Sequence, residues 1–375
     1  MSVAIACLFV NCKQVRKATD LITNPSAREL YAREFEDDSV HFSQWERAFE
    51  ASRNDSLQID LPYSETGTYF SKLYRSYAYD FHLQKGESLF VDVETDSVGK
   101  KVFLDLYNIS TDSLATLKHI KSNDKGKVSL EYSVEQSGEY KLIVQPEITT
   151  TTRFFLRTYT KPLFGFPVAG KDNKAIQSFW GAARDGGKRS HEGLDIFADR
   201  GTPVLAVADG RVSSTGNRGL GGKQVWQRTG MFGYALYYAH LDSILVSSGA
   251  NLKTGDTLGL VGNTGNARTT SPHLHFGIYE GYRGAIDPLP FVQISEIPEF
   301  DYSENQQESP FLVINASRAN LRNSPTTKGQ KIGEAIKNDT LSLLGKTDAW
   351  AHIQNKEGRK AFVHLSLATI PVLPN

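Results

Sequence analysis

The chain of 375 residues contains only two cysteines, Cys7 and Cys12, and both lie in its first dozen residues. The rest of the chain therefore has no disulfide and no thiolate metal site, and any metal must be held by His, Asp or Glu. A long apolar run is also missing, since nothing approaches the roughly 20 residues that a membrane-spanning helix needs. Lys+Arg and Asp+Glu number 42 each, so no net charge attracts the chain to nucleic acid or to an anionic membrane.

Both cysteines belong to a short N-terminal segment, MSVAIACLFVNC, which is apolar from Val3 to Val10. The segment resembles the end of a bacterial lipoprotein signal, in which Cys12 would become the lipidated N-terminus. It departs from that pattern because no Lys or Arg precedes the apolar run, and because Asn11 replaces the usual small residue before the cysteine. We expect an exported protein of the cell envelope, with a lipid anchor at Cys12.

Composition and periodicity divide the chain into five segments. Residues 1–55 hold the signal-like segment and one or two short helices with a break near 37–39. Residues 56–160 alternate between apolar and polar side chains and predict a β-sandwich that serves as scaffold. Residues 161–293 are rich in glycine, residues 294–309 have the polar, acidic composition of a linker, and residues 310–375 alternate again. In the sandwich, three runs each place their apolar residues on one face: Leu89, Val91 and Val93; Val102, Leu104 and Leu106; Tyr140, Leu142 and Val144.

The last segment contains short motifs in a fixed order: Ala319-Asn-Leu-Arg-Asn-Ser-Pro325, Gly333-Glu334, Leu341-Ser-Leu-Leu-Gly345, Trp350-Ala-His-Ile353 and Ala361-Phe-Val-His364. This order resembles bacterial SH3-like domains, which are small β-barrels often found on wall-associated enzymes. His352 and His364 are interpreted as ordinary strand residues rather than metal ligands.

Segment 161–293 carries four of the nine histidines. In Ser271-Pro-His-Leu-His-Phe-Gly277, apolar residues alternate with His273 and His275, which predicts a strand whose two histidines share the face away from the core. A solvent-facing histidine pair on an edge strand is the alternative to a metal site. His191 and Asp195 are four residues apart, and Gly193 with the following Leu-Asp-Ile-Phe-Ala favours extended structure, in which both side chains again share one face.

Two histidines and a carboxylate would make a three-ligand set. Such a set leaves a fourth tetrahedral position for water, which is typical of a catalytic rather than a structural zinc. A cupin-type site is an alternative, because Glu280 follows the His-x-His pair, but no suitable downstream histidine precedes the linker. A thermolysin-like site begins with His191-Glu192, but Asp195 stands where the second histidine should be.

Seven motifs between about Phe164 and Leu289 together resemble the lysostaphin/LytM-like peptidase family (peptidase family M23). The resemblance implies that His191, Asp195 and His275 bind one Zn²⁺ ion, and that His240 and His273 are non-ligand catalytic histidines. The order of the motifs is His191-x-x-x-Asp195, Gly201-Thr-Pro-Val, Ala208-Asp-Gly-Arg-Val, Tyr238-Ala-His240-Leu, Gly262-Asn-Thr-Gly265, His273-x-His275 and Asp287-Pro.

We therefore predict a mainly β, multidomain protein, in which an antiparallel β catalytic domain with an open groove follows a β-sandwich and precedes an SH3-like barrel. The implied activity is that of a zinc metalloendopeptidase acting on peptide cross-links or bridges of bacterial peptidoglycan. The alternative is a non-catalytic wall-binding regulator that recruits or activates other wall hydrolases. Autoinhibition by residues 1–160, which would block the groove, is a further hypothesis. Within the segment, Gly262–Asn266 is interpreted as a turn and Tyr237 and Tyr238 as packing residues. Phe179, Trp180 and Arg184 precede His191 and could line the site, but they are not selected as site residues.

Overall fold

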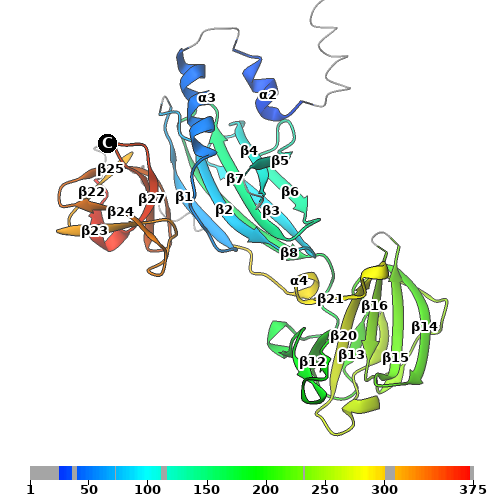
Figure 1. Cartoon of the computed structure of the whole chain (residues 1–375). Coiled ribbons are helices and arrows are strands. Elements are labelled where there is room, and N and C mark those ends of the chain that lie inside the picture. Colours follow the sequence, from blue (N-terminus) through cyan, green and yellow to red (C-terminus); the bar gives the residue numbers. More distant parts are fainter. Residues whose placement is uncertain are drawn as a thin grey trace, which may run out of the picture.

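The computed structural model describes residues 25–35, 40–71, 73–110, 116–230, 233–299 and 309–371. Figure 1 shows three β-rich bodies, with the sandwich in contact with each of the other two. The predicted mainly β, multidomain fold is confirmed. Within the described ranges, no helix has both the length and the apolar character needed to cross a membrane. The predicted anchor at Cys12 lies outside these ranges.

Two helices, α2 (Ala27–Ala32) and α3 (Val40–Ser52), precede the sandwich. Helix α2 begins with a capping box, in which the Ser26 hydroxyl accepts from the Glu29 backbone and the Glu29 carboxylate accepts from the Ser26 backbone. Trp45 of α3 is buried, and its indole N–H donates to the Pro146 carbonyl at 2.8 Å. The helical segment therefore packs onto the sandwich.

The sandwich consists of two antiparallel sheets that enclose one apolar core. The three runs of alternating apolar residues predicted from the sequence all have their apolar side chains in this core. One sheet has the order β2-β7-β4-β5 and the other contains β1-β8-β3-β6. The strands are β1 (Tyr63–Tyr69), β2 (Tyr77–Leu83), β3 (Glu87–Thr95), β4 (Val102–Ile109), β5 (Leu117–Ser122), β6 (Ser129–Ser133), β7 (Gly138–Pro146) and β8 (Thr152–Pro162).

The C-terminal barrel is joined to the sandwich by continuous strand pairing. Thr66 of β1 pairs with Lys346 of β25, and Trp350 and Phe362 of the barrel lie in the core of the sandwich. The two bodies therefore share apolar surface and are not merely tethered. The strands of the barrel are β22 (Phe311–Ile314), β23 (Arg318–Arg322), β24 (Lys331–Ile336), β25 (Thr340–Thr347), β26 (Trp350–Gln354), β27 (Lys360–His364) and β28 (Ala368–Thr369).

The central domain, residues 161–293, has its own apolar core between an 8-stranded and a 3-stranded sheet. The larger sheet has the order β18-β14-β15-β16-β20-β12-β9, with β21 beside β20, and the smaller has the order β13-β19-β17. The strands are β9 (Ile176–Ser178), β10 (Ala183–Arg184), β11 (Arg189–Ser190), β12 (Leu194–Phe197), β13 (Pro203–Leu205), β14 (Gly210–Arg218), β15 (Gly222–Thr229), β16 (Tyr234–Ala239), β17 (Ser243–Ile244), β18 (Asn251–Leu252), β19 (Thr257–Leu260), β20 (His273–Glu280) and β21 (Ala285–Ile286).

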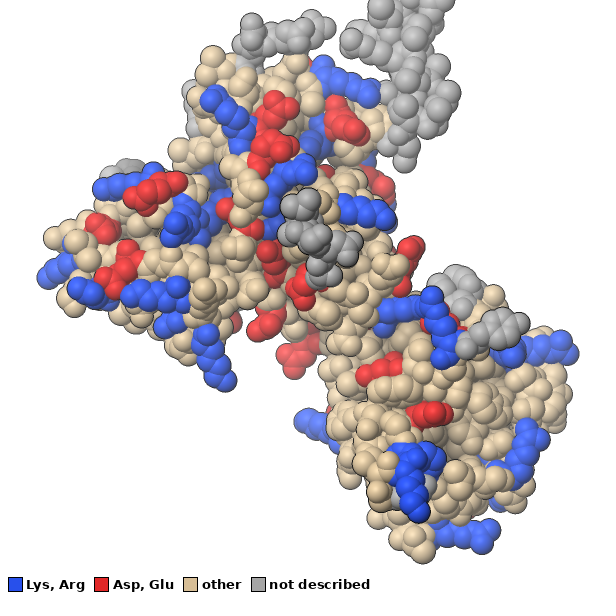
Figure 2. All heavy atoms as spheres, in the orientation of Figure 1, with Lys and Arg blue, Asp and Glu red and all other residues tan. Residues whose placement is uncertain are grey.

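The junction between the central domain and the sandwich is formed around Gly86 and the short helix α4 (Leu289–Val292). Leu163 N donates to Gly86 O at 2.8 Å, and a Cβ on Gly86 would lie 2.5 Å from the Phe291 ring. Lys85 pairs with Glu280 across the same junction at 2.5 Å. On the face drawn in Figure 2, basic and acidic side chains occur together on all three bodies.

Candidate metal centre

Three neighbouring antiparallel strands, β16, β20 and β12, form the floor of the candidate site. In their register Asp195 of β12 lies opposite His275 of β20. The alternate residues Leu274 and Phe276 face the apolar core and have no exposed surface. His273 and His275 therefore project together from the opposite face, as the alternation predicts.

His191 reaches the same point from the segment between β11 and β12. Its backbone N–H donates to Ala182 O at 2.9 Å, which holds the segment against the preceding loop. A Cβ on Gly193 would lie 2.6 Å from Phe276 O and 2.7 Å from the His275 ring. Only glycine leaves room for the His275 side chain at this position, because any larger residue would displace it.

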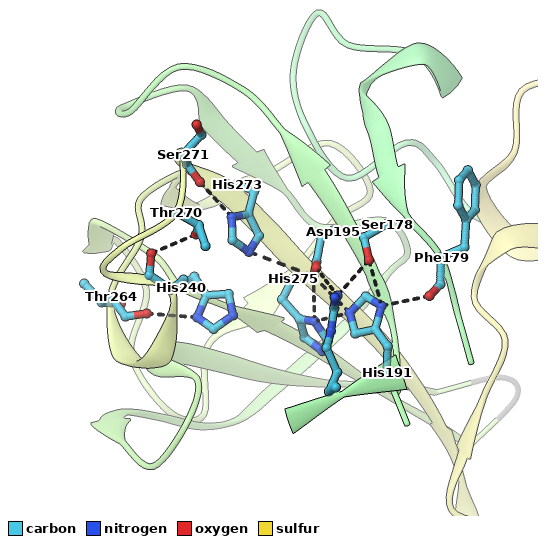
Figure 3. A network of polar contacts seen from close by, with 12 residues as sticks. Ser178, Phe179, His191, Asp195, His240, Thr264, Thr270, Ser271, His273 and His275 are labelled. Atoms are coloured by element: carbon cyan, nitrogen blue, oxygen red, sulfur yellow. Dashed lines mark hydrogen bonds and ion pairs between the residues drawn. The ribbon is translucent and has the colours of Figure 1, made fainter. Parts of the chain in front are cut away.

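His191, Asp195 and His275 bring one donor atom each to a common point (Figure 3). His191 Nε2 lies 3.0 Å from Asp195 Oδ1 and 3.1 Å from His275 Nδ1, and the third distance, from His275 Nδ1 to Asp195 Oδ1, is 3.0 Å. Three donors around a tetrahedral zinc, each about 2.1 Å from it, would lie about 3.4 Å apart. The observed separations need only a small expansion to fit zinc.

A hydrogen bond at Nδ1 of His191 leaves its Nε2 available to bind a metal. His191 Nδ1 lies 2.9 Å from the carbonyl oxygen of Phe179. A carbonyl oxygen can only accept, so Nδ1 carries the proton and the Nε2 lone pair points into the site. Asp195 is held similarly, because Arg184 Nη2 donates to its Oδ2 at 2.6 Å and leaves Oδ1 facing the histidines.

His240 and His273 lie beside this three-residue cluster and point toward it (Figure 3). Their rings are 5.1 Å apart between centroids, and His273 Nε2 is 3.9 Å from Asp195 Oδ1. Each donates its Nδ1–H to a backbone carbonyl at 2.9 Å, His240 to Thr264 and His273 to Ser271. In the neutral state both rings therefore have an Nε2 that can accept a proton.

The sequence model of peptidase family M23 matches residues 189–288, a range that contains all five of these side chains. Residues 189–288 form a peptidase family M23 domain. A model of the bacterial SH3 domain matches residues 317–367, so the C-terminal barrel predicted from its motifs is confirmed.

Two relatives that match over the M23 domain are named as endopeptidases. The L-Ala--D-Glu endopeptidase of Bacillus subtilis is 34% identical over 146 residues, which are 36% of this chain and 44% of that protein. Glycyl-glycine endopeptidase ALE-1 of Staphylococcus capitis is 30% identical over 165 residues, which are 42% of this chain and 40% of that protein. The chain thus spans less than half the length of these curated relatives.

Two further similarities concern a regulator and a solved structure. The murein hydrolase activator NlpD of Salmonella dublin is 36% identical over 124 residues, which are 32% of this chain and 30% of that protein. The catalytic domain of lysostaphin from Staphylococcus simulans is 32% identical, over 31% of this chain and 89% of its own, with a TM-score of 0.28.

The Gly262-Asn-Thr-Gly265 motif of the M23 domain positions His240. Besides accepting from His240 through its carbonyl, Thr264 donates its hydroxyl to Leu241 O at 2.9 Å. A Cβ on Gly265 would lie 2.1 Å from Leu220 O, so the motif packs against the loop before β15. The turn predicted from the sequence is therefore also the support of a site residue.

Burial and neighbouring charges shift the pKa values in the cluster. Burial acts against the Asp195 carboxylate, but the adjacent His191 and His275 rings hold the pKa of Asp195 well below its usual range. Burial, helped by His275 and His273, lowers the pKa of His240 to about 4. At neutral pH the site therefore combines a carboxylate anion with a neutral, proton-accepting His240.

All five residues selected from the sequence meet at this one place, from motifs up to 84 residues apart. Two further contributors are Arg184, which was considered but not selected, and Ser178, which was missed. Neither belongs to a recognised spacing, and both act through hydrogen bonds that depend on how β9 and β10 fold beside β12. Tyr237, interpreted as packing, does pack on Trp226 with ring centroids 4.4 Å apart.

Proposed function

We propose that this protein is a zinc metalloendopeptidase that hydrolyses peptide cross-links or bridges of bacterial peptidoglycan. The observation that carries the proposal is the convergence of His191, Asp195 and His275 with two non-ligand histidines beside them. Among the described residues, this cluster is the one group of three or more His, Cys, Asp or Glu side chains placed to hold a metal. Two imidazoles and one carboxylate suit a single zinc ion with one open position.

A bound zinc ion would supply a Lewis acid that polarises the scissile carbonyl and lowers the pKa of water. Asp195 and His275, on the floor strands β12 and β20, and His191, from the segment before β12, would hold the ion. The Nε2 atoms of His240 and His273 provide the proton transfers. One of the two rings, in its neutral form, takes a proton from the water as the water attacks the carbonyl. The same ring in its protonated form gives a proton to the departing amine, while the other histidine, when its Nε2 is protonated, donates to the oxyanion.

The names of the relatives specify different peptide bonds, so the substrate is proposed only as the class of peptidoglycan peptides. One acts between L-Ala and D-Glu and another on glycyl-glycine, by their names. A cell-wall substrate places the protein in the envelope, and we propose export on that ground. Lipidation of Cys12 stays a prediction. The SH3 domain is proposed to bind the wall and so to raise the local concentration of the M23 domain on an insoluble substrate.

The alternative, a non-catalytic regulator, is represented among the relatives by a protein named as a murein hydrolase activator. Against it stands the full set of five side chains with the tautomers that catalysis needs. Autoinhibition by residues 1–160 also stays a prediction. Hydrogen bonds, ion pairs and ring contacts of the five side chains run to residues 178–275 in the described chain, and none runs to residues 25–160.

The test is mass spectrometry of peptides released from purified sacculi by the zinc-loaded full chain. His240→Ala and His273→Ala are assayed beside Arg228→Met, which alters an exposed side chain of β15. We expect release by the wild type and by Arg228→Met, loss on chelation, and a decrease of about 10²- to 10⁴-fold in each histidine variant with zinc still bound. Zinc-loaded wild type that binds sacculi but releases nothing would favour the regulator.

A further inference from the structure

Arg184 lies in the short hairpin β10–β11 and contacts the carboxylate oxygen of Asp195 that does not face His191 and His275. Its Nη2 donates to Asp195 Oδ2 at 2.6 Å and to Ser178 Oγ at 2.7 Å. Asp195 Oδ1, the other carboxylate oxygen, faces His191 and His275 at 3.0 Å each. The two oxygens of Asp195 therefore have different partners.

A guanidinium group is suited to this place for two reasons. It keeps its positive charge at every pH at which a protein is folded, and it has donors but no acceptor. A hydrogen bond between two charged groups is also about twice as strong as one between neutral groups. Asp195 Oδ2 is therefore held away from the metal position, although a free carboxylate could present both of its oxygens to a cation.

Ser178 connects Arg184 to the second ligand. It lies opposite Asp195 in the β9–β12 pair, and its hydroxyl is 3.4 Å from His191 Nδ1. Arg184 is partly exposed, with 31% of its side-chain surface accessible, whereas only 11% of the Asp195 side chain is accessible. One side chain at the rim thus fixes the relative positions of two buried ligands.

We propose that Arg184 is a positioning residue that keeps Asp195 a one-oxygen zinc ligand and so keeps a coordination position open for the substrate. The inference rests on the zinc function proposed above. It predicts that replacing Arg184 changes the zinc affinity and the coordination number of the bound metal in the absence of substrate. A role in binding substrate, by contrast, would raise KM and leave the metal unchanged.

The experiment compares full-length wild type with Arg184→Met, Arg184→Lys and the surface control Arg228→Met. Zinc affinity is measured by competition with a chromophoric chelator, and coordination by the visible absorption of the cobalt(II)-substituted protein, which weakens as the coordination number rises from four to five. We expect Arg184→Met to bind zinc about 10- to 100-fold more weakly, as for other residues that orient metal ligands. Its cobalt spectrum should also lose intensity.

Arg184→Lys should recover part of both properties, because its ammonium group can still donate to Asp195 Oδ2. If Arg184→Met does not fold, Ser178→Ala replaces it, with an expected loss of about tenfold in zinc affinity. Zinc affinity within twofold of wild type and an unchanged cobalt spectrum would overturn the inference, whatever happens to KM. Wild type that binds no zinc would overturn the proposed function as well as the inference.

Discussion

Two buried carboxylates of this protein lie against histidines, one in the M23 domain and one between the sandwich and the SH3 domain. Asp195 is 3.0 Å from nitrogens of His191 and His275. Glu65 of β1 is 3.1 Å from Nδ1 of His352, on β26 of the SH3 domain. The residue types are the same, yet only the first group is placed to hold a metal.

The difference lies in the other neighbours of each carboxylate. Glu65 Oε2 accepts from the hydroxyls of Tyr63 at 2.5 Å and Tyr79 at 2.8 Å. Burial, together with the Glu65 charge, raises the pKa of both tyrosines well above the ordinary value, so both hydroxyls remain donors. Glu65 and His352 are at most 1% exposed, so the cluster is closed to solvent.

Around Asp195 the neighbours that face inward are electron-pair donors. Neutral imidazole nitrogens and a carboxylate oxygen repel one another unless a proton or a metal ion lies between them. The comparison teaches that a buried carboxylate with hydroxyl partners stabilises an interface, whereas one with imidazole partners and an open side is suited to a cation.

The largest effect is expected from Asp195→Ala. Loss of one of three ligands should remove the Lewis acid and lower peptide release from sacculi by at least about 1,000-fold, or roughly 4 kcal/mol. Asp199→Ala, which removes an exposed carboxylate of the same segment, should leave the rate unchanged. Retention of more than a tenth of the rate by Asp195→Ala would place the metal elsewhere.

Glu65→Ala should lower stability rather than metal binding, because it leaves three buried donors without their acceptor. We expect the free energy of unfolding to fall by about 3 kcal/mol or more, measured by urea denaturation, while the zinc affinity of the folded protein is unchanged. Glu131→Ala, at an exposed position of β6, should change stability by less than about 0.5 kcal/mol. A weakened zinc site in Glu65→Ala would show that the two clusters are coupled.

The pH dependence of activity should reflect the low pKa of His240, which is about 4. A base is active above its pKa, and its activity is lost as the pH falls through that value. For the zinc-loaded protein we expect kcat/KM to stay level from pH 7 to about pH 5 and to decrease below that range. The measurement is a pH–rate profile with zinc content checked at each pH, and an inflection near pH 6.5 would contradict a buried His240 as the base.

The smallest effect is expected from Lys85→Met at the junction between the sandwich and the M23 domain. Lys85 and Glu280 are both partly exposed, at 28% and 26%, so solvent screens their attraction. The free energy of unfolding should change by less than about 1 kcal/mol and the activity not at all. A loss of activity in a stably folded Lys85→Met would indicate that the orientation of the M23 domain matters for catalysis.

For His240, strand alternation and the tertiary structure give different side-chain directions. Along β16, simple alternation would point His240 to the core side with Tyr238. Its backbone instead adopts a left-handed conformation, with φ of 62°, just after the strand ends. Hydrogen bonds from His240 N to Gly221 O and from Nδ1 to Thr264 O hold it there, and both acceptors come from loops distant in sequence. A motif could therefore select His240, but only the packing of these loops turns the ring toward the site.

Sequence analysis predicted the β class and the SH3 domain, which are confirmed, and its family resemblance selected the five residues that lie together in the candidate site. Those features depend on alternation, glycine positions and ordered motifs, which are local properties of the chain. The contacts through which Arg184 and Ser178 orient the ligands arise from tertiary packing. Tertiary packing also decided that His352 is buried against Glu65, 287 residues earlier in the chain. Such contacts depend on which distant strands pair and which loops meet above them, and a one-residue shift in that pairing would move every side chain to the other face.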